Sequence, residues 1–139
     1  MEAIIPYLNF NGNAAEALAF YEKALGGAVS MRSTFGEANM AQDDSMKDKI
    51  LHAVFEAGDL KFMVSDCPPG TTVSSGDQVS LSLNFTSLES IEKTFAALAE
   101  GGAITMPIQD TFWGARFAMT KDKFGVHWMF NYDYPKKDK

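Results

Sequence analysis

The chain has 139 residues, with 18 Asp and Glu against 12 Lys and Arg, and a formal net charge of −6 at pH 7. Nucleic acids and anionic membranes both require basic patches, so this charge excludes them as expected partners. Apolar residues make up 46% of the chain, which excludes disorder and predicts a packed core in one domain; no apolar run approaches the roughly 20 residues of a membrane span.

Cysteine usage indicates the cellular compartment. Cys67 is the single cysteine, so no internal disulfide can form, which suits a reducing cytoplasm. The N-terminus shows no basic region followed by an apolar stretch, and we therefore expect no secretory signal and a cytoplasmic location. Cys67 stands beside two prolines with no sequence sign of an activated thiolate, which favours a structural residue over a nucleophile.

In chain order, the first predicted strand spans residues 3–10 and stops at the turn cluster of residues 11–13. Apolar residues then recur at helical spacing over residues 14–25, which predicts an amphipathic helix. Asn13 and Glu16 have the spacing of a capping pair at its start.

The helix is expected to end at Gly26-Gly27, because glycine supplies the left-handed conformation that closes a last turn. Glycines that follow a helix do not form a phosphate-binding loop, which precedes one, so a structural role is favoured. A β pattern resumes over residues 28–35. The polar residues 36–49 that follow are long enough for a lid or pocket rim, and a solvated excursion is an equally good interpretation.

Strand patterns over residues 50–55 and 60–64 flank an Ala-Gly-Asp turn and predict a hairpin. The next segment, CPPGTTVSSGD at residues 67–77, is rich in Pro, Gly and Ser and is typical of a linker.

The remainder of the chain repeats the first part. A constant shift of 75 relates residues 8–31 to residues 83–106, including LNF at 8–10 and 83–85 and the Gly-Gly-Ala triplets. A strand (residues 79–85), a helix from Leu88 to Ala99 with Thr86 and Glu89 as its capping pair, and a strand (residues 103–109) are predicted. A hairpin of residues 114–121 and 126–132 completes the repeat.

Each half is therefore a βαβββ module, and the predicted fold class is α+β with two tandem modules. We expect one domain over residues 1–139, because each half alone is small for a stable core. Its parts are module one (residues 1–66), the linker (67–77), module two (78–134) and a solvated tail (135–139).

Several segments resemble the PhnB-like branch of the vicinal oxygen chelate superfamily, which includes glyoxalase I, bleomycin-resistance proteins and extradiol dioxygenases. They are PYLNFNGN at residues 6–13, FYEKALGG at 20–27, TFGE at 34–37, TFW at 111–113 and DKFGV at 122–126. The resemblance implies curved mixed sheets around a cavity, and a homodimer. Some members are labelled methyltransferases, but this chain has no glycine-rich nucleotide loop after a strand to support that label.

In that superfamily four side chains hold a divalent metal, two from the first strands of the modules and two from the last strands. The resemblance puts these positions near Pro6, Ser82, Met63 and Met129. Proline and methionine are not ligands for a hard or borderline divalent ion, which prefers imidazole or carboxylate. The neighbouring side chains also make a poor site: they are Tyr7, Asn9, Ser65 and Asn131. We therefore expect no glyoxalase-type metal centre and no cofactor.

Few polar residues remain for a ligand pocket. His52 lies in a predicted strand, where it is either a structural histidine of the barrel or a pocket ligand or base. An unusual site of His52 with Glu37 and Asp66 is a further alternative. Arg116 is suited to an anionic substrate, although an ion pair with Glu56 or Asp110 is the simpler interpretation.

Aromatic residues provide the other candidates. Phe35 and Phe112 occupy similar places in the two halves, and Trp113 adds a large ring; with Tyr7, Phe62, Trp128 and Met129 they line a cavity or pack in the core. The predicted ligand pocket consists of Tyr7, Phe35, His52, Trp113, Arg116 and Met129.

The primary functional hypothesis is a metal-independent protein that binds a small organic molecule as a homodimer. The alternative is a metal-dependent lyase or dioxygenase-like enzyme that uses an atypical site around His52. A third class is a structural or regulatory module without a cavity. The residues do not identify the ligand, and they leave open whether any reaction is catalysed.

Overall fold

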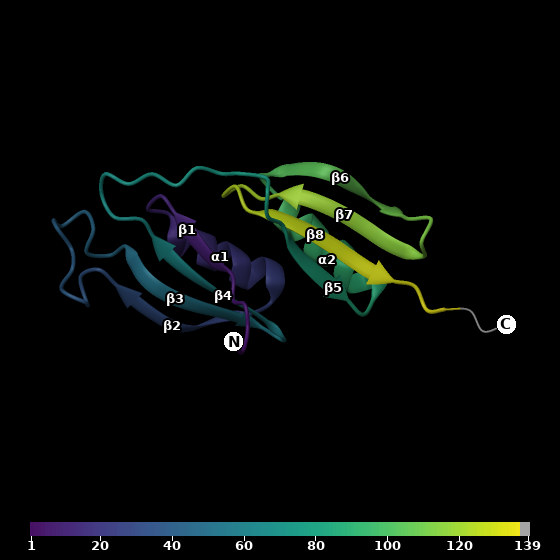
Figure 1. Ribbon diagram of the computed structural model, residues 1–139, viewed down its shortest axis with the longest axis horizontal. Coiled ribbons are helices and arrows are strands. Elements are labelled where there is room, and N and C mark those ends of the chain that lie inside the picture. The colour runs from purple at the N-terminus through teal and green to yellow at the C-terminus, as the bar shows by residue number, and fades with distance from the viewer. Residues whose placement is uncertain (137–139) are drawn as a thin grey trace. The chain divides into compact units, whose positions relative to one another are not determined.

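The computed structural model describes residues 1–136, and the last three residues of the predicted tail lie outside the described part. The chain forms two compact units, residues 1–74 and 75–139. Each unit is a βαβββ module with a four-stranded mixed sheet and one helix, as the repeat predicted (Figure 1). That the two make one domain around a cavity stays a prediction.

In unit 1 the sheet order is β1-β4-β3-β2, with β1 parallel to β4 and the other pairs antiparallel. Its elements are β1 (Tyr7–Phe10), α1 (Ala14–Leu25), β2 (Ala28–Thr34), β3 (Ile50–Ala57) and β4 (Leu60–Asp66).

Unit 2 repeats this topology in the order β5-β8-β7-β6. Its elements are β5 (Leu81–Phe85), α2 (Leu88–Ala99), β6 (Ala103–Asp110), β7 (Ala115–Lys121) and β8 (His127–Asp133). The two helices have the bounds that the apolar spacing predicted.

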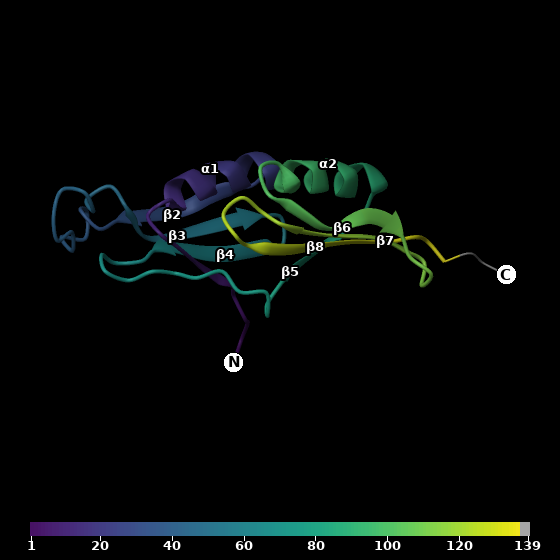
Figure 2. The ribbon, with the colours of Figure 1, turned by 90° about the horizontal axis from the view of Figure 1, so that it is seen from above.

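The helix covers one face of the sheet in each unit (Figure 2). In unit 1, Phe62 of β4 lies between Phe55, at a ring distance of 4.8 Å, and Tyr21 of α1, at 5.5 Å. In unit 2, Phe95 of α2 contacts Phe130 of β8 at 5.4 Å. Because side chains alternate along a strand, each sheet's opposite face carries a second row of residues, which α1 and α2 do not cover.

The start of each helix differs from the prediction. In the described part of the chain the Asn13 side chain makes no cap hydrogen bond; instead the Ala14 N–H donates to Oδ1 of Asp66, at the end of β4 (2.9 Å). In α2 the cap is Ser87, which accepts from the Ser90 N–H (3.1 Å), one residue later than predicted. The first strand begins at Tyr7, and the residues before Pro6 are exposed.

The loop of residues 36–49 is fastened to the rest of unit 1. Phe35 and Met46 are buried, and the Phe35 N–H donates to the Lys49 carbonyl oxygen (3.0 Å). Lys49 Nζ donates to the Gly12 carbonyl oxygen (2.7 Å). The loop is therefore more than a solvated excursion, and a role as lid or rim stays a prediction.

The predicted linker is divided between the units. In unit 1, Asn11 exchanges two hydrogen bonds with the Val73 backbone (2.7 and 2.9 Å). In unit 2, the Ser75 hydroxyl donates to the Gly125 carbonyl oxygen (2.8 Å). Across residues 1–136, none of the helices is both long and apolar enough to span a membrane.

Candidate functional site

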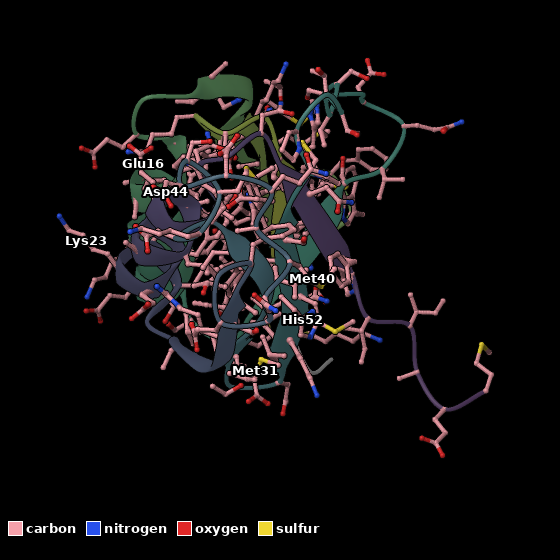
Figure 3. The ribbon with its side chains drawn as sticks, turned by 90° about the vertical axis from the view of Figure 1, so that its left-hand side faces the viewer. Glu16, Lys23, Met31, Met40, Asp44 and His52 are labelled. Atoms are coloured by element: carbon pink, nitrogen blue, oxygen red, sulfur yellow. The ribbon has the colours of Figure 1, made fainter. Side chains whose placement is uncertain are left out.

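The sheet face of unit 1 that is not covered by α1 holds a hydrogen-bonded tyrosine–histidine pair. The Tyr7 hydroxyl oxygen lies 2.9 Å from Nδ1 of His52, and the two ring centres are 5.6 Å apart. Tyr7 is 42% exposed and His52 is half-buried. Figure 3 shows His52 on the side of unit 1 away from Glu16 and Lys23 of α1.

The strand register explains why these two residues meet. Tyr7 is the register partner of Met63 on β4, and Met63 is the partner of Val54 on β3. Tyr7 on β1 and His52 on β3, two residues before Val54, therefore reach toward each other across the intervening strand β4. His52 therefore lies on the sheet face that α1 does not cover. Strand alternation alone could not decide between the two faces.

The pair can both donate and accept hydrogen bonds. When the Tyr7 hydroxyl donates to Nδ1, the imidazole proton is on Nε2, which then donates; protonated His52 donates from both ring nitrogens. A polar ligand group that meets this pair can therefore be recognised by a hydroxyl and an imidazole held in fixed relation. This arrangement suits binding of a hydroxyl, carbonyl or carboxyl group.

The residues at the superfamily's metal positions do not fit a divalent metal. Tyr7, the neighbour of the predicted position Pro6, is the register partner of Met63 in unit 1, and Ser82 is the partner of Met129 in unit 2. Residues 1–136 contain no group of three or more His, Cys, Asp or Glu side chains arranged to hold a metal ion. Thioether and neutral hydroxyl or amide groups are weak ligands for the ions that such centres use.

The alternative site of His52, Glu37 and Asp66 is also not assembled. Asp66 is buried, and its two carboxylate oxygens accept the N–H groups of Ala14 and Ile50, each at 2.9 Å. The Glu37 carboxylate accepts from the Thr34 hydroxyl (3.0 Å). Asp66 thus has a structural role that its sequence position did not reveal.

Arg116 does not reach the uncovered sheet face but pairs with two carboxylates. Its Nε contacts Glu92 of α2 at 2.6 Å, and its Nη1 contacts Asp110 of β6 at 3.0 Å. The predicted alternative of a pair with Asp110 is confirmed, and the contact with Glu92 was missed. These carboxylates raise the pKa of the guanidinium, Glu92 most strongly. Their negative charges also compensate the positive charge that an anionic substrate would meet.

The other predicted pocket residues separate into core and surface. Phe35, Phe62 and Trp128 are buried within their own units, which agrees with the core-packing alternative for these three rings. Met129 is half-buried on the uncovered face of unit 2, where Met119 is its register partner. Trp113 is 58% exposed, on the turn between β6 and β7. Membership of one shared pocket stays a prediction.

Acid is expected to weaken unit 2 through Asp110. The hydrogen bond from Tyr134, followed by that from Arg116, lowers the pKa of the Asp110 carboxyl below its ordinary value of 3.8. Because the folded-state pKa is lowered, this contribution to stability is present above pH 3.8 and is lost as the pH falls through the folded-state value. At neutral pH we expect the urea midpoint of the wild type to be higher than that of Asp110→Asn. At low pH we expect the two midpoints to converge.

The cause can be separated from the general effect of acid. Tyr134→Phe removes the larger contribution, so an NMR titration should place the Asp110 carboxyl pKa nearer 3.8. Asp59→Asn, an exposed turn residue of unit 1, is the matched control. A midpoint gap between wild type and Asp110→Asn that is independent of pH would contradict the assignment.

The chain matches known proteins over most of its length. A family model described as Glyoxalase/Bleomycin resistance protein/Dioxygenase superfamily matches residues 4–130. Protein YjdN of Escherichia coli (strain K12) is 35% identical to this chain, and the match covers 91% of this chain and 92% of YjdN.

Two solved structures share the fold over nearly the same length. Protein PA1353 from Pseudomonas aeruginosa has a TM-score of 0.86 at 42% identity, covering 96% of this chain and 98% of that one. The PhnB protein from Bacillus cereus, for which a 3-demethylubiquinone-9 3-methyltransferase activity has been suggested, has a TM-score of 0.80 at 25% identity, covering 94% and 99%. The resemblance inferred from the sequence motifs is confirmed.

Proposed function

Because the chain belongs to the Glyoxalase/Bleomycin resistance protein/Dioxygenase superfamily, we propose that it binds a small organic molecule without the metal centre of the glyoxalase-type members. Tyr7 and His52 hold a polar group of that ligand. The observation that carries the proposal is the 2.9 Å hydrogen bond between these two side chains on the uncovered face of the unit 1 sheet.

Three observations support this function. Members of the superfamily bind small molecules, and the match spans almost the whole chain. The positions near which a metal would be held carry Pro6 and Met63 in unit 1 and Ser82 and Met129 in unit 2, and Tyr7, next to Pro6, is the register partner of Met63; all are poor ligands for a divalent ion. The Tyr7–His52 pair offers hydrogen bonds in place of Lewis-acid contacts with a substrate oxygen.

We also propose that the two modules form one ligand-binding domain, that the protein is a homodimer, and that it acts in the cytoplasm. Neither the dimer nor the location follows from the described contacts, and both stay predictions from the resemblance and from cysteine usage.

The binding test begins with native mass spectrometry of the freshly purified protein, paired with elemental analysis for nickel, zinc, manganese and iron. We expect a retained organic molecule and substoichiometric metal. Loss of one hydrogen bond to a ligand costs roughly tenfold in affinity, so Tyr7→Phe and His52→Gln should each weaken binding of that molecule about tenfold. The double variant should lose little more than either single variant, because the two side chains act as one unit.

Matched controls are available in unit 2. Tyr132→Phe and His127→Gln make the same chemical changes on β8 and should leave binding unchanged. One metal ion per chain, with binding that disappears when a chelator removes it, would overturn the proposal. So would full retention of the molecule by the Tyr7 and His52 variants.

A further inference from the structure

The two units carry different chemistry at corresponding positions. On β3, Ala53 is the register partner of Val64; on β7, Ala118 is the partner of Phe130. The residue that precedes the alanine is His52 in unit 1 and Phe117 in unit 2. Where unit 1 has an ionisable side chain on its uncovered face, unit 2 therefore has an aromatic ring.

Phe117 is the inner member of a cluster of three rings. Trp113 lies against Phe117 with ring centres 6.3 Å apart, and Phe112 lies edge-on to Trp113 at 5.0 Å. The outer rings are open to solvent, since Phe112 is 97% exposed and Trp113 is 58% exposed. We call Phe112, Trp113 and Phe117 the aromatic cluster.

The turn that carries the outer rings is held by several backbone contacts. The Thr111 N–H donates to the Ala115 carbonyl oxygen (2.7 Å), and the Ala115 N–H donates back to the Thr111 hydroxyl (3.1 Å). Gly114 has a φ of +88°, and its carbonyl oxygen accepts from the Tyr134 N–H (3.0 Å). The cluster is thus presented by an ordered turn, which reduces the entropy that binding has to overcome.

Side-chain amides flank the inner ring. Gln109 on β6 and Asn131 on β8 are the register partners of Phe117, so their side chains share its face of the sheet. The Asn131 amide donates to Asn84 (3.4 Å) and to Asp133 (3.1 Å). An amide both donates and accepts, so this border can recognise a hydroxyl or ring heteroatom at the edge of an aromatic ligand.

We propose that the aromatic cluster binds the planar aromatic part of a small ligand, with Gln109 and Asn131 contacting its polar edge. Offset or edge-to-face contact with exposed rings favours a flat aromatic molecule over a saturated one of equal size. This inference goes beyond the proposed function, because it assigns unit 2 a binding site of its own, separate from the ligand site proposed for unit 1. It makes no use of the Tyr7–His52 pair.

The experiment uses the two tryptophans as reporters in the full-length protein. Trp128 is buried and its indole N–H donates to Asp122 (2.9 Å), whereas Trp113 belongs to the aromatic cluster. The probe is 1-naphthol, with decahydro-1-naphthol as the saturated control. In ¹⁵N-labelled protein, 1-naphthol should shift the Trp113 indole resonance in a saturable way and leave that of Trp128 in place. The saturated alcohol should bind at least tenfold more weakly.

Variants that keep both reporters test the assignment to the cluster. Phe112→Ala and Phe117→Leu should each weaken 1-naphthol binding at least several-fold, and an unchanged Trp128 resonance shows that unit 2 is still folded. Ile104→Ala, which removes an exposed apolar side chain elsewhere on β6, should bind 1-naphthol like wild type.

Three results would overturn the inference. The first is that 1-naphthol causes no shift of the Trp113 resonance, and the second is that the saturated alcohol causes an equal shift. The third is that the Trp113 resonance moves when the protein is diluted but not when the probe is added, which would mean that a second copy of the chain covers the cluster. Because the 1-naphthol response is read from Trp113 in unit 2, failure of this inference is separable from failure of the proposed function, which is read from the retained molecule and its dependence on Tyr7 and His52.

Discussion

Replacing Asp66 by alanine is expected to lower the free energy of unfolding by about 3 to 5 kcal/mol. The carboxylate is 2% exposed, and its two oxygens accept the N–H of Ala14, at the start of α1, and of Ile50, at the start of β3. Removing it leaves two buried donors without their acceptor, and each such donor costs on the order of 1 to 3 kcal/mol. One side chain thus joins a helix, a strand and the end of β4.

Urea unfolding of the Asp66 variants provides the measurement. Asp66→Asn keeps one acceptor oxygen and should lie between wild type and Asp66→Ala, while Asp59→Ala, at an exposed turn of the same unit, should change little. A loss below about 1 kcal/mol for Asp66→Ala would contradict the structural role. A metal content that falls with Asp66→Asn while stability is kept would restore the atypical site with His52.

Gly27→Ala and Gly102→Ala are each expected to destabilise the chain by about 2 to 4 kcal/mol, because an added Cβ would overlap the backbone of the neighbouring hairpin and force it to move. A methyl group on Gly27 would overlap the Glu56 carbonyl oxygen and lie 2.7 Å from the Ala57 Cβ. On Gly102 it would overlap the Lys121 carbonyl oxygen and lie 2.9 Å from backbone atoms of Asp122. The Glu56, Lys121 and Asp122 atoms belong to the backbone, and the Ala57 Cβ is fixed to it, so these atoms cannot turn away as the end of a flexible side chain can.

Two other glycines separate this effect from ordinary glycine preference. Gly26 has a φ of +73° with open space around its position, so Gly26→Ala should cost only the conformational strain, roughly 1 to 2 kcal/mol. Gly76 is also in open space, and Gly76→Ala should be near neutral. Thermal or urea unfolding of the four variants gives the ranking. Equal losses at Gly27 and Gly76 would show that the close approach is relieved at little cost.

The two glycines of each Gly-Gly pair therefore have different structural roles. Gly26, with a φ of +73°, is the left-handed cap of α1, as the sequence predicted. The end of α2 differs from the prediction, because its cap is Glu100 in an extended conformation and Gly101, with a φ of +76°, turns the chain one residue later. The second glycine of each pair allows the following strand to pass close to the neighbouring hairpin. This second role explains why both modules keep two glycines at a place where helix termination requires one.

The two units share one fold but carry different side-chain chemistry on their surfaces. Unit 1 carries the Tyr7–His52 pair on its uncovered sheet face, and unit 2 carries Phe117 and the aromatic cluster at the corresponding register. The core and the glycine turns are shared, while the uncovered faces differ. We infer that the helix-covered faces preserve the fold and that the uncovered faces determine what each unit recognises.

Local residue patterns were sufficient for the elements of this protein. Apolar spacing and the shift of 75 predicted both helices at their observed bounds, the hairpins and the βαβββ order, because helix and strand periodicity depends on near neighbours in the chain. The resemblance to the superfamily rested on specific segments, among them PYLNFNGN at residues 6–13 and TFW at residues 111–113. Residue types also indicated that proline and methionine at the metal positions are unsuited to a divalent ion, since ligand chemistry depends on residue type.

The tertiary structure alone decided which side chains meet. Strand alternation groups His52 with Glu56 but does not say which face they share; the parallel pairing of β1 with β4 brings Tyr7 to His52, 45 residues away. Asp66 caps a helix 52 residues earlier, where the sequence had favoured Asn13. Hydrogen bonds and sheet register between distant segments depend on how the whole chain folds, so the composition of the candidate site could be anticipated while its geometry could not.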